Sequence, residues 1–260
     1  MSYKAIGDYG IIGNGATIAL VGLDGSIDWY CSPHLDSPSL FAALLDDEEG
    51  GRFAVAPDGE PDAVQHYFRE TNILQTLFRT WAGEVEVVDF MPAGETARGL
   101  AGGRDHLIRR VRGLTGAVTL GVECSPRPDY ARLRPEREPL PEGGWRVPDR
   151  DGHQAFRATA ELVWEAERAE LAVAAGDTVW LTLSRDGQGL PADPEHLQAI
   201  LDATHRYWRE WSATSEVTRY PAERFWRESL DRAALVLKLL QFEDTGAIAA
   251  GATTSLPTIL

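Results

Sequence analysis

Short apolar runs separated by turn-forming residues fill the first two-thirds of the chain, and they predict β-strands. In residues 118–124, Val118, Leu120, Val122 and Cys124 alternate with small or polar residues, the period of two that is typical of a half-buried strand. Further strands are expected at residues 18–21, 27–31, 52–56, 73–81, 84–91, 107–112, 154–160, 162–165 and 179–183. A parallel sheet would require helices between these runs, and no helical pattern separates them. The pattern therefore predicts an antiparallel β-sandwich.

Turn signals between the runs predict which strands form hairpins. Asp24-Gly25 and Ala82-Gly83 each stand between two neighbouring runs. A third hairpin is expected around residues 113–116, and a fourth would pair residues 154–160 with 162–165. Residues 126–148 break the strand pattern with many charges and several prolines, so they predict a long surface loop. Five prolines stand before Gly143: Pro126, Pro128, Pro135, Pro139 and Pro141.

A helical pattern begins after Pro191. Asp193 can cap a helix whose first residue is Pro194. The positions that then follow helical spacing are Leu197, Ile200, Leu201, Thr204, Trp208 and Trp211. A second helix is expected from about residue 221 to residue 242, with residues 244–246 marking its end. Strands followed by helices indicate an all-β domain and then a separate helical unit.

The second predicted helix is apolar on most of its circumference. Its apolar positions are Ala233, Ala234, Leu235, Val236, Leu237, Leu239 and Leu240. Such a helix requires partners on most sides, and only one other clear helix is predicted. The following residues, 245–260, carry no charge and would be prone to nonspecific association if they were exposed. We therefore expect both elements to belong to a larger helical domain; the alternative is that both pack on one face of the β domain.

Charge and cysteine content narrow the partners and the compartment. The formal charge of −15 over 260 residues disfavours nucleic acid and anionic lipid and is compatible with neutral sugars. Cys31 and Cys124 both fall in predicted strands, which favours two buried reduced thiols, although a disulfide stays open. The first residues do not form a signal peptide, and no apolar stretch is long enough to span a bilayer. A cytoplasmic location is the expectation.

A collinear set of short motifs carries a resemblance to a known family. The motifs are residues 6–15 (IGDYGIIGNG), 24–29 (DGSIDW), 36–39 (DSPS), 51–53 (GRF), 71–74 (TNIL), 89–92 (DFMP), 237–240 (LKLL), 245–248 (TGAI) and 253–257 (TTSLP). Together they resemble the front part of bacterial and archaeal family 15 glycoside hydrolases, which are glucoamylase- or trehalase-like. The resemblance implies a supersandwich-like β domain, a helical linker and an (α/α)6 barrel that hydrolyses α-glucosidic bonds with inversion. It divides the chain into a sandwich at 1–190, a linker at 191–218 and the start of an incomplete barrel at 219–260.

Two departures from the family pattern bear on function. His34-Leu35 stands where the family usually has Arg-Phe, which would alter a domain contact if that arginine anchors one. Residues 258–260 stand where the family continues into a segment that lines the sugar pocket, and its catalytic glutamates lie further on still. The resemblance therefore implies no catalytic residue in this chain, and we expect the chain to be inactive by itself. The substrate expected for a complete enzyme is an α-glucan oligosaccharide or trehalose.

Four residues inside the family-like motifs are the candidates for substrate contact: Asp28, Trp29, His34 and Asp36. An aromatic ring beside a carboxylate suits a sugar, but structural hydrogen bonds in strand ends and loops are the stronger interpretation for the two acids. The six histidines lack metal-ligand spacing, and no phosphate-binding loop is present, so neither a metal nor a cofactor is expected. Two other functions stay open: a stand-alone carbohydrate-binding or interaction module, and a subunit that a separate barrel chain completes.

Overall fold

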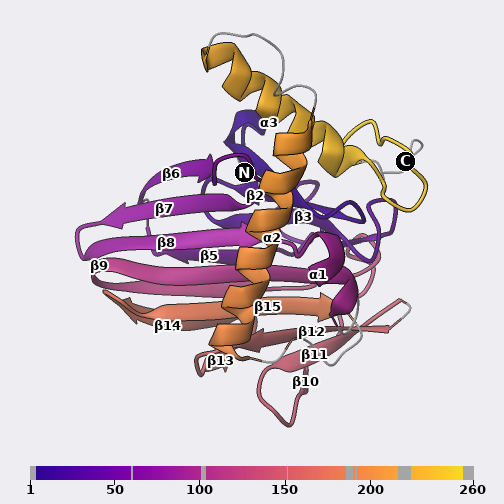
Figure 1. The fold of residues 1–260 in the computed structure, drawn as a ribbon. Coiled ribbons are helices and arrows are strands. Elements are labelled where there is room, and N and C mark those ends of the chain that lie inside the picture. The colour runs from indigo at the N-terminus through magenta and orange to yellow at the C-terminus, as the bar shows by residue number, and fades with distance from the viewer. Residues whose placement is uncertain are drawn as a thin grey trace.

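The structure is a computed structural model that describes residues 4–59, 61–100, 104–150, 152–185, 190, 192–215 and 224–253, with backbone alone at 224 and 225. Within these residues the chain forms fifteen strands in two packed layers, with helices against one outer face (Figure 1). The strands are β1 (Tyr9–Gly13), β2 (Ile18–Gly22), β3 (Ser26–Cys31), β4 (Ser39–Phe41), β5 (Phe53–Pro57), β6 (Asp62–Tyr67), β7 (Leu74–Thr80), β8 (Gly83–Phe90), β9 (His106–Cys124), β10 (Glu138–Pro139), β11 (Trp145–Asp149), β12 (Gly152–Ala158), β13 (Trp164–Glu165), β14 (Arg168–Ala174) and β15 (Thr178–Arg185). The helices are a 3-10 turn (Ile6–Asp8), α1 (Gly94–Gly99), α2 (Pro194–Thr214) and α3 (Arg224–Leu240).

One long strand, β9, joins the two layers. Its first half pairs with β8 and β15 in the sheet β6-β7-β8-β9-β15-β12-β11-β10. Its second half pairs with β5 and β14 in the other sheet, which continues through β3 and β2 to β1. The pairs named here are antiparallel, and a single apolar core fills the space between the layers. The predicted antiparallel sandwich is confirmed.

The hairpin predicted around residues 113–116 is wrong, because β9 runs through this segment without turning back. Instead, Gly113 and Gly116 allow the backbone of neighbouring segments to lie close to β9. A Cβ on Gly113 would overlap the carbonyl oxygen of Ala174, and one on Gly116 would overlap that of Ala82. Gly116 also has a φ of +65°, a backbone conformation that favours glycine. Glycines in a strand thus mark a crossing point between layers here.

One further pairing prediction and one loop prediction also fail. The runs at 154–160 and 162–165 do not pair with each other; β12 lies between β11 and β15, whereas β13 pairs with β14. The loop predicted at 126–148 is also interrupted by β10 and the start of β11. Trp145 is buried there and stacks on Phe156 with ring centroids 5.1 Å apart, so apolar burial draws the segment into the sheet.

The helix predicted after Asp193 is confirmed as α2. The Asp193 carboxylate accepts a hydrogen bond from the Glu195 backbone N–H at 3.1 Å. α2 crosses the outer face of the sheet that contains β7, β8 and β15 (Figure 1). The predicted apolar stripe is buried there, with Leu197, Ile200 and Trp208 in one cluster with residues of the sheet. The strand residues of that cluster include Val88, Ile108 and Trp180.

Replacing the cap should loosen α2 by a measurable amount. We expect Asp193→Ala to lower the free energy of unfolding by about 1 kcal/mol, since the Glu195 N–H loses its acceptor. Asp202→Ala is the matched control, because Asp202 is exposed in the middle of the same helix and alanine favours helix there. Urea unfolding followed by tryptophan fluorescence measures both. An equal or smaller loss for Asp193→Ala than for Asp202→Ala would contradict the capping role.

The described residues cover α3 on one side only. Leu235 and Leu239 are buried against the sandwich, whereas Trp226, Leu230 and Leu237 expose 61%, 40% and 56% of their surface. The three exposed residues lie four and seven positions apart and therefore share one helix face, which we call the exposed α3 face. The predicted start of this helix near residue 221 lies outside the described residues, and its end at Leu240 is close to the predicted one.

The two cysteines are buried and are not joined to each other. Cys124 belongs to the core between the sheets, and Cys31 belongs to a separate small cluster with Trp29 and Ala42. Burial raises the pKa of the Cys124 thiol well above its ordinary value, so this thiol is unreactive. No helix among the described residues is long and apolar enough to cross a membrane.

Candidate functional site

The C-terminal segment, residues 241–253, lies against loops from the first third of the chain, close to β3 and α1 (Figure 1). The backbone N–H of Glu243 donates to the carbonyl of Gly15 at 2.8 Å. We call this contact the junction; it consists of residues 14–17, Trp29, His34 and Arg104 on one side and residues 241–253 on the other. Two of the four residues predicted to contact substrate lie in it.

Trp29 is a junction residue with a buried ring. The side chain is 0% exposed, and its Nε1–H donates to the carbonyl oxygen of Ala252 at 3.0 Å. This bond spans more than two hundred residues and ties β3 to the C-terminal segment. A buried indole has no free face on which a sugar ring could stack, so Trp29 acts here as an anchor for the chain.

His34 also contacts the C-terminal segment. Its ring meets the Phe242 ring edge-on, with centroids 5.3 Å apart. The Nδ1 atom is buried and has no hydrogen-bond partner among the described residues. The family-like position where an arginine is usual thus does lie at a contact between the sandwich and the segment that follows α3. Asp36, two residues on, is exposed.

Asp28 faces a different set of partners. The carboxylate accepts a hydrogen bond from the Tyr9 hydroxyl at 2.7 Å and is ion-paired with Lys4. Burial, and then the hydrogen bond to Asp28, raise the pKa of the Tyr9 hydroxyl above its ordinary value. Lys4 also donates to the Ser26 hydroxyl at 2.6 Å. Asp28 therefore fastens the N-terminal residues to β3.

An arginine–carboxylate cluster completes the junction and was not predicted from the sequence. Glu243 accepts hydrogen bonds from Arg98 and Arg104, both at 2.8 Å. Arg104 also donates to Asp244 at 2.5 Å, and this bond holds the pKa of Asp244 below its ordinary value. The nearby Asn14 side chain donates to the Arg104 carbonyl at 2.6 Å. Asn14 lies inside the first family-like motif, so a polar residue between two glycines was the available signal.

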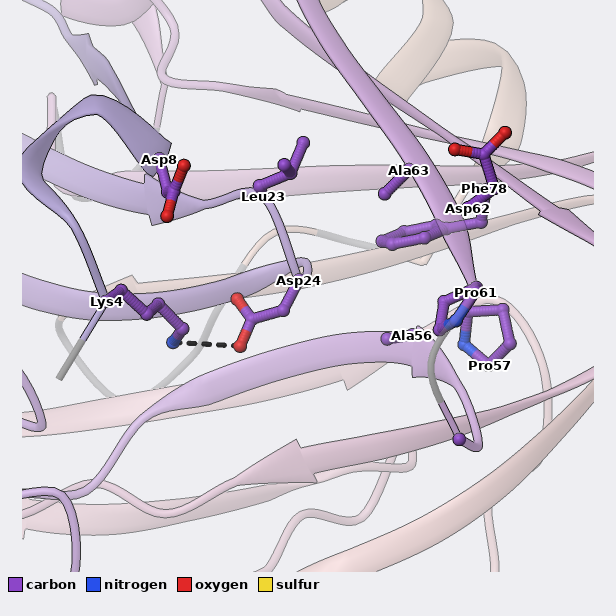
Figure 2. Close-up of a pocket in the computed structure, with 11 residues that line it drawn as sticks. Lys4, Asp8, Leu23, Asp24, Ala56, Pro57, Pro61, Asp62, Ala63 and Phe78 are labelled. Atoms are coloured by element: carbon purple, nitrogen blue, oxygen red, sulfur yellow. Dashed lines mark ion pairs between the residues drawn. The ribbon is translucent and has the colours of Figure 1, made fainter. Parts of the chain in front are cut away.

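A hollow of about 650 Å³ lies between the β2–β3 turn and β6 and is a candidate for a small-ligand pocket (Figure 2). Asp8 and Asp24 stand on one side of it, and Asp62 stands on the other side together with Pro57 and Pro61. Burial alone would raise the pKa of Asp24, but the hydrogen bond and charge of Lys4, 2.8 Å away, outweigh it and lower the pKa. A carboxyl with a lowered pKa is unsuited to act as the general acid of glycoside hydrolysis, which requires a raised pKa.

The described residues hold no group of three or more His, Cys, Asp or Glu side chains with the arrangement of a metal site. The junction is an anchoring surface for the C-terminal segment. It binds this segment to the sandwich through the ring contact of His34, the arginine–carboxylate cluster and the backbone bond to Gly15.

Comparison with known proteins matches most of the chain. The family described as "Trehalase-like, N-terminal" matches residues 2–175. The trehalase of Mycolicibacterium smegmatis is 32% identical over 277 residues, which cover 98% of this chain and 41% of that protein. The trehalase of Mycobacterium tuberculosis is 31% identical, with 98% and 40% covered. Trehalase 1 of Sulfolobus acidocaldarius is 31% identical over 253 residues, with 95% and 40% covered. The chain thus spans about two-fifths of the length of these curated relatives.

Proposed function

Because the chain belongs to the trehalase-like N-terminal family, we propose that it forms the front part of an α-glucosidic glycoside hydrolase. In this proposal the sandwich carries α2 and α3 and holds them in place for a catalytic helical domain. The relatives that match nearly the whole chain are longer proteins named trehalases, which supports this arrangement. Membership of glycoside hydrolase family 15 and the (α/α)6 form of the helical domain are parts of the proposal that rest on the resemblance of the motifs.

The exposed α3 face is the observation that carries the proposal. Leu230 and Leu237 lie on one side of a helix whose other side is anchored to the sandwich. Large apolar residues at i, i+7 spacing on an exposed helix face are typical of a surface that packs on another helix. Further helices of a catalytic domain would bury this face, and residues 241–253 would lead into them from the junction.

In this proposal the sandwich supports the catalytic domain and supplies no catalytic group. Inverting hydrolysis needs two carboxyl groups about 6.5–9.5 Å apart, one as general acid and one to activate water. We propose that both belong to the helical domain and that trehalose, or else a short α-glucan, is the substrate. The two thiols are buried and are not joined to each other, which suits a reducing compartment, so we keep a cytoplasmic location within the proposal.

A chimera tests the proposal. Residues 1–240 of this chain would be joined to the part of the Mycolicibacterium smegmatis trehalase that follows the matching helix. We expect the chimera to hydrolyse trehalose and the 260-residue chain to show no turnover. Inversion at one anomeric carbon would release one β-glucose and one α-glucose, which proton NMR distinguishes from the two α-glucoses of a retaining enzyme.

Leu237→Lys tests the exposed α3 face in the same pair of proteins. In the 260-residue chain we expect the melting temperature to change by no more than about 2 °C, since Leu237 is 56% exposed. In the chimera a lysine would be buried without a partner, so we expect loss of most activity. Turnover of trehalose by the 260-residue chain would overturn the proposal. So would a chimera that tolerates Leu237→Lys.

A further inference from the structure

A fully exposed tryptophan marks a second surface of the sandwich. Trp81 is 100% exposed at the turn between β7 and β8. This turn lies at the end of the sandwich opposite the C-terminal segment (Figure 1). An indole that is fully exposed removes no apolar surface from water, so it contributes little to the stability of the fold.

The backbone that carries Trp81 is held rigidly. The Thr80 hydroxyl accepts hydrogen bonds from the backbone N–H groups of Ala82 and Gly83, both at 3.2 Å. Gly83 in turn packs so closely on β9 that a Cβ would overlap the carbonyl of Thr115. A fixed turn that presents an exposed ring loses little conformational entropy when a ligand binds.

Trp81 stands on the rim of a hollow of about 700 Å³. Both apolar and polar side chains line this hollow. The lining residues that bear on the choice of ligand are Pro57, Pro61, Asp58, Arg79 and Thr119. Pro57 and Pro61 also line the hollow of about 650 Å³ that Figure 2 shows. Both hollows have these two prolines in their linings, and we call the surface formed by the two hollows and Trp81 the Trp81 groove. Each half falls in the volume range of small-molecule sites, about 300–1,000 Å³.

The groups in the groove favour a neutral, hydroxyl-rich ligand. Asp58 in one half and Asp8 and Asp62 in the other accept hydrogen bonds, as hydroxyl donors require, and they repel phosphates. Arg79 makes only half-exposed ion pairs, at 3.2 Å to Glu84 and 3.9 Å to Asp62, which can rearrange at little cost. The electron-rich face of the Trp81 ring attracts the polarised C–H groups of a sugar ring.

We infer that the Trp81 groove is an accessory binding site for a linear α-glucan, separate from the junction and from any catalytic site. One sugar ring stacks on Trp81, and the following rings run past Pro57 and Pro61 into the second hollow. The neutral oligosaccharide class follows from the groove itself. The α-linked glucan class rests on the proposed function.

Calorimetry on the 260-residue chain with maltoheptaose tests the inference. We expect a dissociation constant on the order of 1 mM, and weakening by at least about tenfold in Trp81→Ala. Trp226→Ala is the matched control, because Trp226 is also an exposed tryptophan but lies on the exposed α3 face. Trehalose, which can fill only one end of the groove, should bind more weakly than maltoheptaose. Since Trp81 is fully exposed, Trp81→Ala should fold normally.

Three results would overturn the inference: no binding of maltoheptaose, equal loss in Trp81→Ala and Trp226→Ala, or a monomer–dimer equilibrium that Trp81→Ala abolishes. The last would identify the groove as a contact between two copies of the chain. The test is independent of the proposed function, since binding is measured without hydrolysis.

Discussion

Arg109→Met should be the most destabilising single change, with a loss of about 3–5 kcal/mol in the free energy of unfolding. Arg109 and Asp89 are both 0% exposed and form a bidentate pair with bonds of 2.7 and 3.1 Å. Arg109 also donates to the carbonyls of Phe53 at 2.6 Å and Gly25 at 2.7 Å. Methionine fills a similar volume but leaves the Asp89 charge and both carbonyls without a donor inside the core.

Urea unfolding monitored by tryptophan fluorescence measures this loss, and Arg79→Met is its matched control. Arg79 pairs with Glu84 at 3.2 Å on the surface of the neighbouring hairpin, so we expect a change of at most about 1 kcal/mol. Adding Asp89→Leu to Arg109→Met removes the uncompensated charge and should recover part of the stability. A loss below about 1 kcal/mol for Arg109→Met, or no recovery in the double variant, would contradict this account.

The Arg109 contacts also explain why separate sequence motifs occur together. Gly25, Phe53 and Asp89 belong to three different motifs of the family resemblance, and all three bind this one guanidinium. The sequence cannot reveal the link, because Arg109, Arg110 and Arg112 follow one another in the same strand. Only the pairing of β8 with β9 determines which of them turns inward. The motifs were enough to identify the family. The physical reason for three of them, a shared contact with Arg109, is visible only in the folded structure.

The sequence pattern predicted those strands and helices in which buried positions recur at a regular spacing. The second half of β9 and the stripe of α2 both follow such a repeat, and both are confirmed. β6 escaped prediction because it alternates between exposed and half-exposed positions at a sheet edge, where apolar residues are not required. The continuity of β9 was not predicted either, because glycine is equally suited to a turn and to a close backbone contact.

The candidate site was predictable only in outline. Trp29 and His34 were singled out from motifs, and both lie in the junction, but the sequence could not show that Ala252 and Phe242 are their partners. Contacts that span more than two hundred residues leave no local signal. Arg104 and Glu243 were missed for the same reason, because each looks like an ordinary surface charge until the two segments meet.

The second large effect is expected from Arg232→Ala, which should weaken the attachment of α3 to the sandwich. The Arg232 side chain donates to the Thr71 carbonyl at 2.8 Å and to the Asn72 side chain, and Asn72 donates to the Leu235 carbonyl at 3.3 Å. The guanidinium also lies 3.9 Å from the ring centre of Tyr67, and desolvation lowers its pKa below the ordinary value. We expect Arg232→Ala to cost about 2–3 kcal/mol in the attachment of α3, because it leaves Thr71 and Asn72 with buried acceptors that lack a donor.

Hydrogen exchange separates this local effect from global unfolding. Protection of the α3 amides should fall by about 30–150-fold in Arg232→Ala, whereas amides of β9, in the sandwich core, should keep most of theirs. Arg227→Ala removes an exposed arginine from the same helix and should change α3 protection by less than about threefold. If the sandwich holds α3 in position for a catalytic domain, Arg232→Ala should also lower the activity of the chimera without changing the anomers it releases. Unchanged α3 exchange in Arg232→Ala would mean that Leu235 and Leu239 alone secure the helix, and that the Thr71-Asn72 motif has another cause.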